Sequence, residues 1–225
     1  MFIKVQFPLL GAGKTLSLVY LTWNKWFYSR MKIFSNIHLY KIPYYYIDSI
    51  DKLRNMKDGW VAIDELWSIL RARCSTSKRN QVVGDILLRS RKLNLTYCFT
   101  TQLLSLIDKN IRSITDFTAY PLLNPDETIC KLVIFKGGSS TSGQYLKTIY
   151  YRTYIPMSCY NTNEIVDMKD ESDKPLEIRF QENFKPEHGN FCTCEECKGQ
   201  VFKTWEEAEK VANEYWLRLH KKGVI

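Results

Sequence analysis

The sequence predicts an α/β fold, a three-layer sandwich with a mainly parallel central sheet. Strand-like apolar runs alternate with helical patterns through the first half of the chain, in the order β-α-β-α-β-α. At least one run, 60–63, is apolar throughout, as is typical of strands buried on both faces. The 225 residues are enough to bury a sizeable core. Later β-rich segments predict β-hairpin additions to this sheet.

The first half supplies the alternating elements. Residues 2–7 alternate in polarity and lead into a glycine-containing loop, which indicates a strand. The helical pattern of residues 14–30 follows, and then come short strands at 32–35 and 60–63. We expect these last two strands to be central and parallel.

The next elements repeat the pattern. Helical spacing returns at residues 65–70 and 81–92, a strand is expected at 95–100, and another helix at 104–112. No internal repeat interrupts the series.

The second half is divided differently. Runs at 131–135 and 145–151, joined by the Gly/Ser stretch 137–143, predict a hairpin with a mobile tip. A helix is expected at 204–220. We predict three parts, which are a main domain (1–166), a charged linker (167–190) and a small Cys-containing C-terminal segment (191–225).

The composition narrows the class of partner and the compartment. The formal net charge of +8 favours a polyanionic partner, either nucleic acid or an acidic surface. No apolar run approaches the roughly 20 residues that span a bilayer, and no secretory signal is visible. We therefore expect a soluble protein of the cytoplasm, or of the host cytoplasm if the protein is viral.

A phosphate-binding loop is predicted directly after the first strand. Residues 8–15 read PLLGAGKT, which nearly satisfies the pattern G-x-x-x-x-G-K-[ST] between a strand and a helix. Its backbone N–H groups would cradle the phosphates of ATP, Lys14 would bridge the β and γ phosphates, and the Thr15 hydroxyl would ligate Mg²⁺. Pro8 replaces the first glycine and lacks an N–H. The predicted nucleotide-binding residues are Gly11, Ala12, Gly13, Lys14, Thr15 and Leu16, together with Asp64.

Two adjacent carboxylates follow the apolar run 60–63. A parallel neighbouring strand would bring Asp64 and Glu65 beside the phosphates, where Asp64 would hold Mg²⁺. Glu65 would orient and deprotonate the attacking water, which favours hydrolysis over transfer to a second substrate. Alone, such a pair is more often the N-terminus of a helix, but the phosphate loop reverses that preference.

Gln102 follows the strand expected at 95–100. It lies at the edge of the sheet where ligands of such folds bind, so it could sense the γ-phosphate. It could equally cap the next helix.

Five segments in this order resemble one group of proteins. They are the phosphate loop, KIFSNIHL (32–39), GWVAIDELW (59–67), RSRKLNLTYCFTTQ (89–102) and YNTNEIV (160–166). The chain looks like a member of the FtsK/HerA superfamily with a RecA-like P-loop ATPase core, and it is most similar to viral genome-packaging ATPases and zonular occludens toxin-like proteins. The resemblance covers roughly residues 1–166 and favours Gln102 as the γ-phosphate sensor.

This resemblance implies a homo-oligomeric ring, often hexameric, that moves double-stranded DNA through its pore. An arginine of one subunit would complete the site of the next. Arg89 and Arg91 match that position and are the first candidates for this arginine, and Arg71 and Arg73 are the second candidates. A viral capsid is a further expected partner. The alternatives are a cellular or plasmid translocase or helicase, a phage assembly or extrusion ATPase, and a nucleotide-dependent switch or kinase.

Basic residues are dense between 71 and 92, where the sequence has seven Lys or Arg and a single acidic residue, Asp85. They would either contact DNA phosphates or lie at solvated positions of a helix, and the sequence favours the two interpretations equally. The aromatic residues at 23, 26, 27 and 44–46 are assigned to packing.

A cysteine cluster near the C-terminus could bind Zn²⁺. His188, Cys192, Cys194 and Cys197 offer four ligands of the kind that tetrahedral zinc prefers. In a variant, Cys194, Cys197 and His220 form a degenerate zinc finger with His188 or Cys192 as the fourth ligand. The alternative is reduced thiols in a tail.

Overall fold

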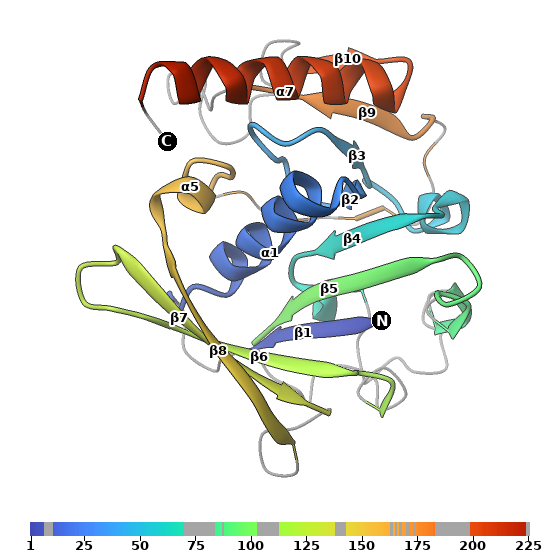
Figure 1. The fold of residues 1–225 in the computed structure, drawn as a ribbon. Helices are drawn as coiled ribbons and strands as arrows, with labels where there is room; N and C mark the ends of the chain where they lie inside the picture. The colour runs from blue at the N-terminus through green and yellow to red at the C-terminus, as the bar shows by residue number, and fades with distance from the viewer. Residues whose placement is uncertain are drawn as a thin grey trace.

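A single ten-stranded sheet organises the part of the chain that the structure describes (Figure 1). The computed structural model describes residues 1–6, 11–69, 84–86, 88–102, 113–137, 143–162, 164, 166, 168–169, 172, 174–182 and 199–223. The strands are Phe2–Gln6 (β1), Lys32–Ser35 (β2), Tyr44–Tyr46 (β3), Gly59–Ile63 (β4), Leu95–Thr101 (β5), Phe117–Leu123 (β6), Ile129–Lys136 (β7), Gln144–Arg152 (β8), Glu177–Phe180 (β9) and Gln200–Phe202 (β10). The helices are Lys14–Ser29 (α1), Asp51–Asn55 (η1, a 3-10 helix), Leu66–Ile69 (α2), Tyr154–Met157 (α5) and Trp205–Lys221 (α7).

The strand order is β10-β9-β3-β2-β4-β5-β1-β6-β7-β8. The middle of the sheet, from β3 to β6, is parallel throughout. Antiparallel strands extend both edges, with β7 and β8 at one end and β9 and β10 at the other. The loops that follow the parallel strands therefore meet along one edge of the sheet.

Helices cover both faces of the sheet. α1 and α7 lie on one face, where Trp26, Trp60 and Trp216 are among the buried residues of the larger hydrophobic cluster (Figure 1). The other face carries α2 and the second cluster, which includes Tyr97 and Phe99. β4 is buried at all five positions, because it lies inside the sheet with apolar cover on both sides. The assignment of the aromatic residues to packing is confirmed.

The predicted fold class is confirmed, and the first predicted strands match β1, β2, β4 and β5 closely. One expectation about their arrangement was wrong. β4, which leads to Asp64, is not the neighbour of β1, because β5 pairs with both strands and lies between them. The strand that ends near Gln102 is therefore the direct neighbour of the phosphate-loop strand.

Several elements were not predicted. β3, β6 and β10 were absent from the sequence-based description, and β9 lies within the range expected to be a linker. β9 buries Ile178 and Phe180 against the core while it pairs with β3. The division of the chain into three parts stays a prediction.

Other expectations fall on residues that lie outside the described ranges. These include the helix at 104–112, the first three residues of the helix at 81–92 and Pro8. Within the described ranges, no helix is long and apolar enough to cross a membrane.

Candidate nucleotide and magnesium site

The phosphate loop ends where α1 begins. Gly11 and Gly13 adopt left-handed backbone conformations with φ of 72° and 85°, which glycine adopts readily. At Gly13 a side chain would also meet Leu123, since an added Cβ would lie 3.2 Å from Leu123 Cγ. The N-terminus of α1 has no side-chain cap and no acid in its first turn, so its N–H groups can receive an anion.

Asp64 is held by two hydroxyl groups directly beside this loop. Thr15 Oγ1 donates to Asp64 Oδ2 at 3.0 Å, and Thr100 Oγ1 donates to Asp64 Oδ1 at 2.5 Å. Burial raises the pKa of the Asp64 carboxyl, while these hydrogen bonds oppose the rise. Asp64 thus projects toward Thr15 from β4, across the end of the intervening strand β5.

The backbone of Asp64 is fixed by Asn36, which follows β2. The Asn36 side chain accepts from the Asp64 N–H at 2.8 Å and donates to the Asp64 carbonyl oxygen at 3.0 Å. Asn36 is buried, so neither group of Asp64 has ready access to water as a substitute partner. This pair of hydrogen bonds links the loop after β2 to the carboxylate.

Glu65 lies in a left-handed turn directly after Asp64, with φ of 52°. Its N–H donates to Thr100 Oγ1 at 2.8 Å, so one hydroxyl positions both acidic residues. Burial and the neighbouring Asp64 raise the pKa of the Glu65 carboxyl. Burial lowers the pKa of Lys14, and the nearby charges of Asp64 and Glu65 counter this shift. A raised pKa suits a general base better than an ordinary carboxylate.

The phosphate loop and Glu65 border a pocket of about 390 Å³. Gln102 reaches it from the end of β5, and Tyr160 and Thr162 reach it from the segment after β8. The full lining is Gly11, Ala12, Gly13, Lys14, Thr15, Leu16, Glu65, Gln102, Leu123, Glu127, Met157, Tyr160 and Thr162.

The donor set fits a hydrated magnesium ion. The oxygens of Thr15 and Asp64 are 3.0 Å apart, and adjacent ligands of an octahedral Mg²⁺ with bonds of 2.0–2.1 Å lie about 3 Å apart. Both could therefore hold the same ion, and the pocket leaves space for phosphate and water oxygens.

Other predicted residues lie elsewhere. Arg89 and Arg91 are exposed and do not line this pocket; Arg89 borders a separate cavity of about 440 Å³ with Arg54 and Asp85. Arg71 and Arg73 lie outside the described residues. So do His188, Cys192, Cys194 and Cys197, and the residues that are described contain no group of three or more His, Cys, Asp or Glu side chains that could hold a metal ion.

Sequence reasoning missed Thr100 as a member of the site. Its signal was present, because it stands at the end of a strand-like run whose next residues were already expected at the ligand edge. Glu127 was not recognisable. Tyr160 and Thr162 belong to the segment 160–166 that carries part of the resemblance, but only the fold shows that they lie beside the loop.

Comparisons with known proteins agree with this fold. Residues 43–121, about a third of the chain, match the family model for zonular occludens toxin (Zot). The crystal structure of the N-terminal domain of zonular occludens toxin from Neisseria meningitidis aligns with a TM-score of 0.51 and 21% identity, over 71% of this chain and 98% of that one. The comparison with curated proteins finds no match.

Two weaker structural matches are to the genome packaging NTPase B204 from Sulfolobus turreted icosahedral virus 2. The complex with AMP aligns with a TM-score of 0.47 and 11% identity, over 66% of this chain and 97% of that one. The complex with ATP-gammaS gives a TM-score of 0.47 and 10% identity, over 67% and 96%.

The sheet, the phosphate loop and the acidic residues beside it define the P-loop NTPase fold. The predicted resemblance to zonular occludens toxin-like proteins is confirmed by the family match and the shared fold. The wider FtsK/HerA grouping stays a prediction.

Proposed function

We propose that this protein hydrolyses ATP to move double-stranded DNA, as a genome-packaging motor that works in a homo-oligomeric ring. The observation that carries the proposal is the convergence of Lys14, Thr15, Asp64, Glu65 and Gln102 at the ends of neighbouring parallel strands. A helix N-terminus, a cation and a general base are the parts that hydrolysis of a phosphoanhydride needs.

Each residue has a role in this proposal. The N–H groups of Gly11–Thr15 and the ammonium of Lys14 bind the phosphates, and Thr15 and Asp64 hold Mg²⁺, which neutralises phosphate charge when bound. Glu65 accepts a proton from the attacking water, and Gln102 contacts the γ-phosphate. Thr100 positions both acids.

Support for DNA as the partner comes from charge and from resemblance. The chain carries a net charge of +8. Its basic residues include Arg89 and Arg91, which are exposed and free to act on a neighbouring subunit in a ring. B204 is described as a genome packaging NTPase, and the sequence motifs resemble the same class.

The test is phosphate release from ATP with and without double-stranded DNA. We expect turnover that rises with DNA, and loss of at least about 100-fold on Lys14→Ala. Lys25→Ala, on the same helix but outside the pocket, is the matched control and should retain turnover. DNA movement is then scored by displacement of a third strand from a triplex.

The outcomes separate the alternatives. Turnover that DNA does not stimulate would reject the translocase proposal and leave an ATPase of another kind. Phosphate transfer to an added acceptor, with little release to water, would identify a kinase. Full turnover in Lys14→Ala would reject the nucleotide site itself.

A further inference from the structure

The segment after β8 borders the pocket, and we call its described residues, 154–162 and 164, the strap. It begins with α5, which packs on α1 (Figure 1). Met157, Tyr160 and Thr162 of the strap line the pocket together with the phosphate loop. An aromatic ring, a thioether and a hydroxyl group suit a nucleoside better than they suit phosphates. The strap therefore forms the wall that the phosphate loop does not supply.

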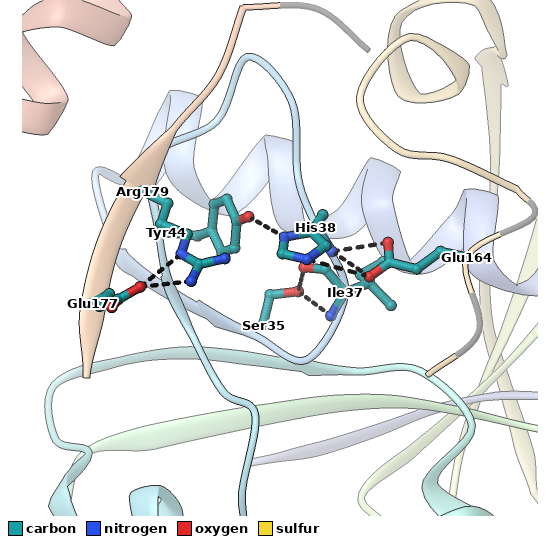
Figure 2. Close-up of polar contacts among 7 residues, drawn as sticks. All are labelled: Ser35, Ile37, His38, Tyr44, Glu164, Glu177 and Arg179. Atoms are coloured by element: carbon teal, nitrogen blue, oxygen red, sulfur yellow. Dashed lines mark hydrogen bonds and ion pairs between the residues drawn. The ribbon is translucent and has the colours of Figure 1, made fainter. Parts of the chain in front are cut away.

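Three consecutive residues of the loop after β2 hold the strap. The Tyr40 N–H donates to the Cys159 carbonyl oxygen at 2.8 Å, and Leu39 forms an antiparallel bridge with Tyr160. The His38 N–H lies 3.0 and 3.1 Å from the two carboxylate oxygens of Glu164 (Figure 2). Glu164 is thus the side-chain contact at the far end of the strap.

The same loop holds the backbone of Asp64. Asn36, two residues before His38, makes the paired hydrogen bonds to the backbone of Asp64. A short stretch of backbone therefore connects the strap to the metal-binding residue.

The Glu164 contact depends on the backbone N–H rather than on an ion pair. Its side chain is only 12% exposed, so it has little water to bind instead. The His38 ring is neutral near pH 7, because burial and nearby Arg179 lower its pKa to about 4. Nδ1 of that ring lies 3.0 Å from the Tyr44 hydroxyl (Figure 2). The ring also stacks on Tyr46. Arg179 turns toward Tyr46 and pairs with Glu177.

We propose that Glu164 is a positioning residue that latches the strap over the nucleotide pocket through the His38 N–H and so sets the affinity for the nucleoside part of ATP. This inference rests on the proposed function only in taking the pocket to be a nucleotide site. It does not require that the protein moves DNA.

The test compares binding of Mg·ATPγS and of Mg·tripolyphosphate by calorimetry, without DNA. Glu164→Ala should weaken ATPγS binding about tenfold and leave tripolyphosphate binding within twofold, because the strap faces the nucleoside. Glu164→Gln keeps an oxygen that accepts from His38 and should bind ATPγS like the unchanged protein. In turnover, Glu164→Ala should raise KM more than it lowers kcat.

Glu177→Ala is the matched control, since it removes a carboxylate from the same region that does not touch the strap. It should change neither ligand's affinity. If Glu164→Ala fails to fold, Glu164→Asp, which shortens the reach by one methylene, should show the same selective loss.

Two results would overturn the latch. One is unchanged ATPγS affinity in folded Glu164→Ala or Glu164→Asp. The other is an equal loss for ATPγS and tripolyphosphate, which would mean that the residue acts on the whole site. If the unchanged protein binds neither ligand, or if Lys14→Ala binds both normally, the nucleotide site itself is rejected and the latch with it.

Discussion

Two polar clusters lie beside each other where β2 and β4 end, and they differ in what they face. The first, the acidic cluster, contains Asp64, Glu65 and Thr100, and its Glu65 lines the pocket beside Lys14. The second, the latch, contains Glu164 and His38, and its polar groups are turned toward one another (Figure 2). The first is arranged to receive a ligand and the second to join two segments.

The electrostatics of the two clusters explain the difference. Burial raises the pKa values of both Asp64 and Glu65, and the charge of Asp64 raises that of Glu65 further, so a cation bound here would stabilise the charged carboxylates. In the latch, a carboxyl group meets a backbone donor and a neutral ring. Changes to the first should therefore affect chemistry, and changes to the second should affect affinity and stability.

The largest effect is expected from Glu65→Gln. Removal of the general base should lower kcat about 1,000-fold while ATP still binds. The fold should not suffer, because Glu65 is destabilised as an anion by burial and by Asp64. Single-turnover kinetics measure the rate of hydrolysis, and the melting temperature measures the stability of the fold. A kcat within tenfold of the original would show that another group activates the water.

Asn36→Ala should cost stability as well as activity. It leaves the buried N–H and carbonyl of Asp64 without partners, which should lower the free energy of unfolding by about 2 to 4 kcal/mol. Urea denaturation measures the loss. A change below about 1 kcal/mol would mean that the Asp64 backbone finds other partners.

The sequence was sufficient to predict the acidic cluster but not the latch. Lys14, Thr15, Asp64 and Glu65 belong to two short motifs with fixed spacing, each at the end of a strand with a strong apolar signature. Local patterns of this kind can be recognised without knowledge of the fold. The order of the strands did not follow from them, and β5 lies where β4 was expected.

The latch depends on contacts between distant segments. His38 and Glu164 are 126 residues apart, and the donor is a backbone N–H that every residue except proline carries. No residue type at position 38 could have signalled it. The Asn-Thr-x-Glu segment was visible as a resemblance, but its contact partner was not.

The latch should make stability depend on pH. Burial raises the pKa of Glu164 to about 7 in the folded protein, above its usual 4.5, so the folded state keeps a proton that the unfolded chain releases. Stability contributed by this group is therefore lost as pH rises from about 4.5 to about 7. Relative to Glu164→Gln, the protein should lose roughly 2 kcal/mol between about pH 5 and 8. Urea denaturation of both at each pH measures this, and a constant difference would contradict it.

The smallest effect is expected from His38→Ala, which separates the backbone of the latch from its ring. The substitution removes the hydrogen bond to the Tyr44 hydroxyl and the stacking on Tyr46, which should cost about 1 kcal/mol. The backbone N–H of residue 38, which donates to Glu164, is retained. The affinity for ATPγS should therefore stay within about twofold of that of the unchanged protein. Denaturation and calorimetry on the same sample test both parts. A tenfold loss of affinity would instead assign the latch to the imidazole ring, and the neutral state of that ring would then need direct measurement by its NMR titration.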